Sequence, residues 1–240
     1  MENIFKRVNL IFAIALIIII IMSILLNTMK TAQTIDASDQ EHLERIKILI
    51  DPGHGGMDQG ASGDLKIGEA PINLAISKKL MKFLEGNGFQ VKMTRYSDTG
   101  LYTGTSNSIR DKKNEDLRNR VKLINNTQAD LTLSIHLNSF PQKQYYGAHV
   151  FYQKSNQATT KLAADLIQES MKNILDNTNH RVPQLKRDIK IMDDTTVPVI
   201  LVECGFLSNI EEEKKLVNEE YQEKVAWAIY TGIIKYFNEL

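Results

Sequence analysis

The chain has 240 residues, of which 42% are hydrophobic and 24% are charged, a composition that supports one sizeable hydrophobic core. Lys and Arg, 29 in all, balance 29 Asp and Glu, so the excess positive charge that holds nucleic acid by its phosphates is missing, and nucleic acid is excluded as a partner class. Cys204 is the only cysteine, which excludes an intramolecular disulfide.

The first 30 residues differ from the rest of the chain. Residues 8–26 (VNLIFAIALIIIIIMSILL) contain only two polar side chains, and a helix of this length, at about 1.5 Å per residue, covers the roughly 30 Å hydrocarbon layer of a bilayer. Lys6 and Arg7 precede this segment and only Lys30 follows it closely, so the positive-inside bias places residues 1–7 in the cytoplasm and the remainder outside. No small-residue cleavage site follows the segment, which favours an uncleaved transmembrane signal anchor over a removed signal peptide.

Residues 27–45 are polar and lack apolar periodicity, and we interpret them as a short tether that leads to a folded domain at 46–240. In that domain, short apolar runs alternate with segments whose apolar residues recur at three- and four-residue spacing. Strands are predicted at 46–50, 89–94, 131–136, 148–152 and 199–203, and helices from Pro71 to the glycines at 86 and 88 and at 115–125, 157–175 and 221–237.

This alternation predicts the α/β class, with a single mostly parallel or mixed twisted sheet and helices on both faces. Residues 96–114 are polar and rich in Gly, Ser and Thr, and they predict a long surface loop that borders the site. Ligands of such sheets bind where the loops diverge at the carboxyl ends of the strands, so functional residues are expected at the strand ends.

Two histidines and two glutamates occur at such positions. His54 follows the first strand, Glu69 precedes the first helix, and His136 and Glu203 end two later strands. Taken singly, each has a structural interpretation: a loop residue, an acid near a helix N-terminus, a core histidine and a surface carboxylate. Together, two imidazoles and one carboxylate suit a catalytic zinc site with a fourth position for water, and the remaining glutamate is free to act as a base.

The glycine-rich loop around His54 does not fit the nucleotide-binding motifs. Gly53 and Gly55 begin a G-x-G, but Asp58 stands where a dinucleotide-binding fold needs its third glycine. No G-K-[ST] follows for a phosphate-binding loop. The spacing therefore argues against a nucleotide ligand.

The remaining histidines and the cysteine are predicted to be structural. Cys204 has no histidine next to it in sequence and alternates to the face of its strand opposite Glu203, so we expect a small buried residue and not a nucleophile. The other histidines have no matching acidic partners; they are His42, His149 and His180.

Three blocks of the chain resemble the signature of a known family. They read IDPGHGGMDQGASGDLKIGE at 50–69, ADLTLSIHLNS at 129–139 and VPVILVECGFLSN at 197–209. These blocks are similar to those of the zinc-dependent N-acetylmuramoyl-L-alanine amidases of type 3, and the resemblance spans nearly all of residues 46–238. The layout of one anchor and one catalytic domain, without wall-binding repeats, is most similar to the germination-specific amidases of spore formers.

The resemblance implies zinc as the cofactor, with His54, Glu69 and His136 as metal ligands and Glu203 as the catalytic residue. It implies peptidoglycan as the substrate and, as the bond cleaved, the amide between the lactyl group of N-acetylmuramic acid and L-alanine. It further implies action outside the cytoplasm, in maturation of the spore cortex.

Other family positions are matched or changed. Arg95, Arg120 and Asn138 fall where the family carries the same residue types, and they are candidates for shaping the site. Ala70 stands where the family usually has Lys, and Leu137 where it has a small residue. Neither change removes a ligand, but groups around the ligands tune metal affinity and specificity.

Two alternative functions stay open at this point. In the first alternative, the domain is a catalytically inactive module that binds peptidoglycan. In the second, it is a zinc peptidase that cuts another amide of the stem peptide. An accessory protein that assists metal binding or activity is also left open by the sequence.

Overall fold

The computed structural model describes residues 43, 45–104 and 108–240, and residues from 45 onward belong to one compact unit. The predicted signal anchor at 8–26 and most of the predicted tether at 27–45 lie outside the described residues. Among the residues that are described, no helix combines the length and apolar character needed to cross a bilayer.

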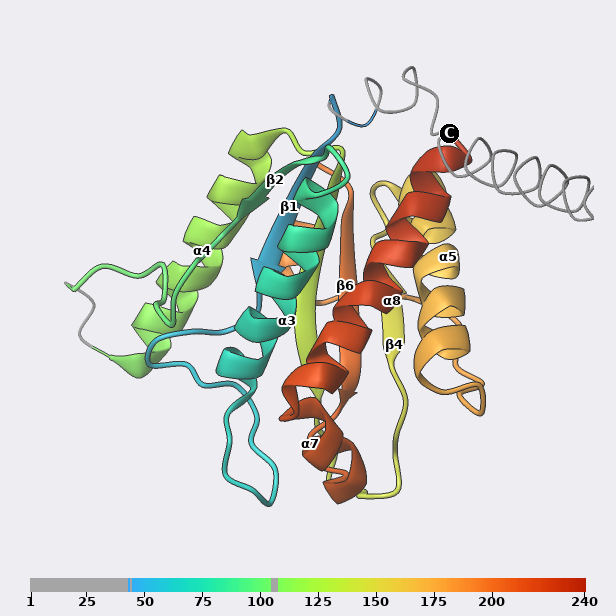
Figure 1. Ribbon diagram of the computed structural model, residues 1–240. Helices are drawn as coiled ribbons and strands as arrows, with labels where there is room; N and C mark the ends of the chain where they lie inside the picture. Colours follow the sequence, from blue (N-terminus) through green and yellow to red (C-terminus); the bar gives the residue numbers. More distant parts are fainter. Residues whose placement is uncertain (1–42, 44, 105–107) are drawn as a thin grey trace, which may run out of the picture. The chain divides into compact units, whose positions relative to one another are not determined.

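One mixed sheet forms the centre of this unit (Figure 1). Its strands are β1 (Lys47–Pro52), β2 (Gln90–Met93), β3 (Leu131–Asn138), β4 (His149–Tyr152), β5 (Gln184–Leu185) and β6 (Val199–Phe206). They lie in the order β2-β1-β3-β6-β4-β5, and every neighbouring pair is parallel except β4 with β6. The prediction of a single mixed α/β sheet is confirmed.

Helices cover both faces of the sheet. They are α3 (Glu69–Glu85), α4 (Ile109–Thr127), α5 (Gln157–Leu175), α6 (Lys190–Asp193), α7 (Ile210–Leu216) and α8 (Glu219–Asn238). Helices α3 and α5 pack on the sheet and against α8, whereas α4 and α6 contact each other and strands β1 and β6. Figure 1 shows α3, α8 and α5 together in front of the sheet.

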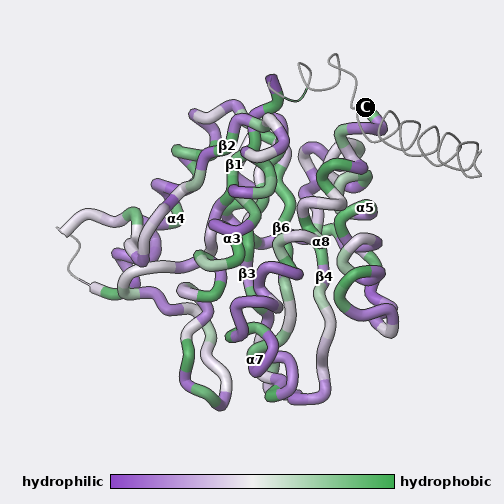
Figure 2. Tube along the Cα trace, in the orientation of Figure 1, coloured by the Kyte–Doolittle hydropathy of each residue, from purple (hydrophilic) through white to green (hydrophobic). Residues whose placement is uncertain are grey.

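The central strands are buried because both faces of the sheet carry helices. Ile48 and Ile50 are almost completely buried, and on the face toward α4 and α6 Leu49 and Leu201 belong to a core cluster with Ile124. In Figure 2 the central strands are largely green, whereas purple segments are frequent along the surrounding helices and loops. The open part of the sheet is therefore the edge where β1, β3 and β6 end.

The prediction of a loop over the whole of 96–114 is wrong at its end, because α4 begins at Ile109. Ser108 is its N-cap, and the hydroxyl of Ser108 accepts the backbone N–H of Asp111 at 3.1 Å. The polar composition of 109–114 hid the helix, since its first turns face water and carry no apolar stripe.

The connections between α5 and β6 and between β6 and α8 also contain short elements that the sequence did not predict. They are β5, α6 and α7. Helix α7 begins at the N-cap Asn209, whose side-chain oxygen accepts the backbone N–H groups of Glu211 and Glu212. This helix follows β6 directly and so lies next to the open edge of the sheet.

Candidate metal centre and active site

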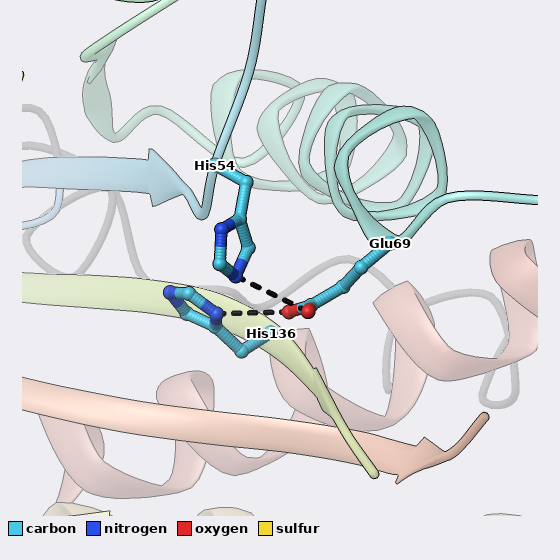
Figure 3. A group of neighbouring side chains, drawn as sticks. All are labelled: His54, Glu69 and His136. Atoms are coloured by element: carbon cyan, nitrogen blue, oxygen red, sulfur yellow. Dashed lines mark hydrogen bonds and ion pairs between the residues drawn. The ribbon is translucent and has the colours of Figure 1, made fainter. Parts of the chain in front are cut away.

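Three of the sequence-predicted residues meet at this edge (Figure 3). His54 lies two residues after β1, Glu69 is the first residue of α3, and His136 belongs to β3. His54 Nε2 is 3.1 Å from Glu69 Oε2, and His136 Nδ1 is 2.9 Å from Glu69 Oε1. One ligand atom from each residue lies within 4.8 Å of the other two.

The Glu69 carboxylate is buried and held by several donors. The backbone N–H of Leu137 donates to its Oε1 at 2.9 Å, and that of Ala61 donates to its Oε2 at 3.1 Å. Asn73, one turn later on α3, donates from Nδ2 to Oε1 at 3.1 Å. Burial alone raises the pKa of Glu69, but the hydrogen bonds and charges of the two histidines outweigh burial and hold this pKa far below its ordinary value.

A second carboxylate orients His54. Asp58 Oδ2 is 3.0 Å from His54 Nδ1, which leaves Nε2 facing Glu69, and Lys113 of α4 pairs with Asp58 at 2.8 Å. Burial lowers the pKa of His54, but hydrogen bonds to Asp58 and Glu69 outweigh it and raise the pKa to about 9. A carboxylate on the outer nitrogen of a metal-binding histidine fixes its tautomer and ring orientation. Asp58 follows His54 by four residues in the sequence, but this spacing alone does not predict that Asp58 orients the His54 ring.

The backbone at His54 is held in a conformation that side chains rarely adopt, with φ of 61°. Arg95 donates from Nε to the carbonyl of Pro52 at 3.0 Å and from one terminal nitrogen to that of Gly53 at 2.9 Å. Arg120 donates to the carbonyls of Pro52 and His54. These two arginines, at positions that match the family, therefore hold the loop that carries His54, and we call Arg95 and Arg120 the arginine clamp.

Arg120 is itself fixed by a buried ion pair. Its guanidinium lies 2.6 Å from Asp51 Oδ1 and 2.6 Å from Asp116 Oδ2, and Asp51 also accepts hydrogen bonds from Thr94 and Ser134. Burial opposes ionisation of Asp51, but the Arg120 charge and the Thr94 hydroxyl outweigh it and lower the pKa of Asp51. Asp51, the first residue of the DPGH segment at 51–54, thus anchors this segment to Arg120 of α4.

Two glycines are required by close approach in this loop. A Cβ at Gly53 would lie 2.2 Å from the His136 ring. Gly60 has φ of 69°, and a Cβ there would lie 2.6 Å from Glu69 Oε2. Larger residues at either position would displace the candidate ligands.

Glu203 lies directly beside this group. It is paired with His136 across strands β3 and β6, and both residues line one cavity of about 350 Å³ in front of α6. Its Oε2 atom is buried and has no hydrogen-bond partner among the described residues. Burial raises the pKa of Glu203 to about 7, although the nearby His136 charge opposes this change.

These residues fit a zinc ion on two observations. Two imidazoles and one carboxylate form the donor set that zinc takes in hydrolytic sites, where three protein ligands leave one position free. Glu203, whose buried Oε2 lacks the hydrogen bond that such an atom ordinarily makes, lines the same cavity as His136.

The other residues singled out by sequence have different roles. The side chain of Asn138 accepts the backbone N–H of Ser139, and Leu137 contributes its backbone to Glu69. Ala70 is buried, and its carbonyl accepts a hydrogen bond from Arg95.

The predictions for the cysteine and for one of the other histidines are confirmed. Cys204 is buried, and burial raises the pKa of its thiol. His149 is buried with Nε2 bonded to the carbonyl of Val182 at 2.9 Å, as expected of a structural histidine. His180 lines a surface hollow whose lining includes none of the candidate ligands, and His42 lies outside the described residues.

Helix α7 holds the loops on either side of the site through two glutamates that the sequence analysis missed. Glu213 is fully buried and accepts the backbone N–H groups of Asp64 and Leu65, which lie between His54 and Glu69 in sequence. Glu212 accepts those of Gly147 and Phe206. Nothing in the run EEE at 211–213 separates these two from the exposed Glu211, and only tertiary contacts distinguish them.

Comparisons with known proteins agree with this arrangement. The family model described as N-acetylmuramoyl-L-alanine amidase matches residues 48–235. The germination-specific N-acetylmuramoyl-L-alanine amidase of Bacillus subtilis strain 168 is 41% identical over 192 residues, which cover 80% of each chain.

Solved structures show the same similarity. The CwlD amidase of Clostridioides difficile, determined in complex with the GerS lipoprotein, is 44% identical with a TM-score of 0.79, covering 82% of this chain and all of that one. An N-acetylmuramoyl-L-alanine amidase from Clostridium difficile 630 is 30% identical with a TM-score of 0.68, covering 80% of this chain and 97% of that one.

Proposed function

Because the chain belongs to the N-acetylmuramoyl-L-alanine amidase family, we propose that it hydrolyses the amide between the lactyl group of N-acetylmuramic acid and L-alanine in peptidoglycan. The observation that carries the proposal is the meeting of His54, Glu69 and His136 beside the unpartnered carboxyl of Glu203. Metal ligands and a free acid at one strand edge are what metal-assisted amide hydrolysis uses.

His54, Glu69 and His136 would hold the zinc ion. When bound, zinc lowers the pKa of coordinated water toward roughly 7 and stabilises negative charge on a carbonyl oxygen. The protein's part is to keep His54 Nε2, His136 Nδ1 and the Glu69 carboxylate converged, which Asp58, Leu137 and the arginine clamp support.

Glu203 handles the proton. Its pKa of about 7 lets Oε2 accept a proton from the attacking water and deliver it to the departing nitrogen near neutral pH. The carboxyl makes no competing hydrogen bond through Oε2 within the described chain, so no protein group has to be displaced before this atom takes up a proton. Such proton transfer contributes roughly a hundred- to ten-thousandfold in rate.

The test compares Glu203→Gln with His54→Ala and His136→Ala. We expect Glu203→Gln to retain zinc but to lose roughly a hundred- to ten-thousandfold in turnover, because the amide keeps the shape and removes the proton carrier. The histidine variants should lose zinc and turnover together. Metal content by mass spectrometry and release of amino groups from purified peptidoglycan measure both quantities. Near-normal turnover in Glu203→Gln would overturn the assignment.

The same assay separates the alternatives. A zinc-loaded chain that binds peptidoglycan but releases no amino group of L-alanine is a binding module. Product masses that show cleavage at another amide of the stem peptide indicate a peptidase.

We also propose that residues 8–26 anchor the chain in the membrane, with residues 27–45 as tether and residues 46–240 acting outside the cytoplasm. The apolar length of 8–26 and the flanking Lys6 and Arg7 support this placement. External protease added to intact cells should digest the domain while leaving a membrane-bound fragment. Recovery of the chain in the washed soluble fraction would contradict the anchor.

The biological setting that we propose is the spore cortex, on the basis of the germination-specific relative. Because the similar CwlD amidase was solved with a lipoprotein, we propose a lipoprotein as the accessory partner here too. Deletion of the gene should leave cortex without the amidase product in spore muropeptide profiles. Copurification of the tagged chain from sporulating cells tests the partner.

A further inference from the structure

Three aromatic side chains are exposed on the connection that follows β3, the strand that carries His136. Phe140, Tyr145 and Tyr146 are 44%, 41% and 46% exposed, and we call this group the aromatic platform. All three belong to the connection between β3 and β4, which begins three residues after His136. Clustered exposed aromatic rings are typical of binding surfaces.

The platform rests on a buried base. The rings of Phe140 and Tyr145 lie 5.6 Å apart between centroids, and both lie against Phe206, at 5.5 and 6.3 Å. Phe206 is only 1% exposed, and the guanidinium of Arg181 lies 4.8 Å from its ring. The exposed rings are therefore supported from beneath.

Hydrogen bonds also fix the backbone of the platform from outside the connection. They run from Phe140 N to Ser208 Oγ at 3.0 Å, from Asn209 Nδ2 to Tyr145 O at 3.3 Å, from Arg181 Nε to Tyr146 O at 3.1 Å and from Gly147 N to Glu212 Oε1 at 3.0 Å. A surface fixed before binding loses less conformational entropy when a ligand arrives.

The strand register places the platform close to Glu203. Glu203 pairs with His136, and Phe206 pairs with Asn138, so the base of the platform lies three residues further along β6. Glu203 also pairs with His149 of the antiparallel β4, which brings the end of the β3–β4 connection to the same edge. At about 3.3 Å per residue, the platform begins roughly 10 Å beyond the site.

Beside the two tyrosines lies a hollow of about 280 Å³. Its polar lining includes Gln144, Thr178, His180 and Arg181. Amide and hydroxyl groups thus stand next to aromatic faces, a combination suited to a ligand with an apolar face and polar edges.

We propose that the aromatic platform binds the glycan strand that carries the scissile amide, an inference that rests on the proposed function. A pyranose ring presents a face of C–H groups that packs on aromatic rings, and its hydroxyl and N-acetyl groups bond to amide and hydroxyl side chains. The lactyl carboxyl of muramic acid is consumed in the amide, so the glycan is neutral there, whereas the stem peptide carries carboxylates. The side chains of the platform are likewise neutral.

Binding of a sugar oligomer tests the platform without catalysis. The full chain in detergent is titrated by calorimetry with chitotriose, a neutral oligomer of N-acetylglucosamine. We expect saturable binding that weakens about tenfold in Tyr145→Leu and in Tyr146→Leu, because leucine keeps an apolar contact and removes the flat ring. Thermal melting shows whether each variant folds. Since the ring of Tyr145 lies against the buried Phe206, Tyr146→Leu serves as the test if Tyr145→Leu does not fold.

Kinetic selectivity gives a second test. The zinc-loaded chain cleaves soluble uncrosslinked peptidoglycan strands and muramyl dipeptide, which has a single sugar. In the platform variants the ratio of kcat/KM for strands over that for muramyl dipeptide should fall about tenfold. The matched control is Trp227→Leu, an equally exposed aromatic at 46% on α8, for which the ratio stays unchanged.

The outcomes separate this inference from the proposed function. An unchanged ratio together with unchanged chitotriose binding in folded platform variants would overturn the glycan assignment and point to a protein occupant. Absence of cleavage of both substrates, with platform-dependent chitotriose binding intact, would instead overturn the hydrolase and leave the glycan site standing.

Discussion

At the scale of single residues, the candidate ligands depend on neighbours that do not face the cavity. His54 is oriented by Asp58 on its outer nitrogen, and its backbone is held at φ of 61° by the arginine clamp. Glu69 receives donors from three separate segments. Each neighbour removes a rotation that would separate the ligand atoms, so substitutions there should act on metal affinity before they act on folding.

Asp58→Ala should weaken zinc binding roughly ten- to hundredfold, because His54 loses the partner that fixes its tautomer and ring orientation. Competition with a fluorescent zinc chelator measures the dissociation constant. The control is Asp64→Ala, a neighbouring acid whose carboxylate pairs at the surface with Lys143 and which should leave the constant unchanged. Equal zinc affinity in Asp58→Ala and the native chain would refute the orienting role.

The buried pair of Asp51 and Arg120 predicts acid sensitivity. Since the pKa of Asp51 is lowered on folding, its stabilising contribution is present above the unfolded value near pH 4 and is lost as pH falls through the lower folded value. Asp51→Asn should therefore cost about 3 kcal/mol at pH 7, because Arg120 loses its buried partner.

Urea unfolding at pH 7 and at successively lower pH values measures this difference. The gap between Asp51→Asn and the native chain should narrow toward low pH, where the native carboxyl is protonated too. Asp165→Asn breaks only the exposed pair with Lys161 and should change the free energy of unfolding by less than about 1 kcal/mol. A gap that stays constant with pH would contradict the assignment.

At the scale of elements, the seven-residue helix α7 has more influence than its length suggests. Two of its glutamates accept four backbone N–H groups from three segments around the site. Its N-cap Asn209 also reaches the carbonyl of Tyr145. Helix α7 therefore links the loop between two candidate ligands to the aromatic platform.

Glu213→Gln should destabilise the chain by about 2 kcal/mol, because the amide that replaces one carboxylate oxygen cannot accept both N–H groups. Hydrogen exchange at Asp64 and Leu65 should accelerate relative to the rest of the domain. Glu211→Gln on the same helix, where the acid is exposed and pairs with Lys214 at the surface, is the control and should shift stability by less than about 0.5 kcal/mol. Unaltered exchange at both amides in Glu213→Gln would show that the loop is held by other contacts.

At the scale of the whole molecule, the candidate metal ligands come from three separate parts of the chain. His54 in the loop after β1, Glu69 in α3 and His136 in β3 are brought together only in the folded chain, so zinc should bind the native state and not the unfolded one. Zinc at about a hundred times its dissociation constant should add about 2.7 kcal/mol to stability.

Thermal melting with a strong chelator and with restored zinc checks this expectation. The melting temperature should fall on chelation and recover with zinc, and His136→Ala should show neither change. If the melting temperature of the native chain changed neither with the chelator nor with added zinc, these residues would hold no ion.

Much of this whole could be predicted from the sequence because the signals are periodic or placed at strand ends. Apolar runs such as 131–136 and helical spacing in 157–175 located the main elements, and the ends of those strands located His54, Glu69, His136 and Glu203. What escaped prediction lacks such signals. Helix α6 has four residues, the first turns of α4 are polar apart from the exposed Ile109, and Glu213 is buried by a loop 148 residues away in sequence.

The unsatisfied oxygen of Glu203 implies that thermal stability and turnover make opposite demands on this residue. An unpaired buried polar atom costs about 1–3 kcal/mol, so the fold is destabilised at the residue that we propose as the proton carrier. Glu203→Leu should raise the melting temperature while abolishing turnover, a result that a thermal scan and a peptidoglycan assay report together. Selection for heat resistance without an activity screen would therefore enrich variants at Glu203 that melt at higher temperature but no longer hydrolyse peptidoglycan.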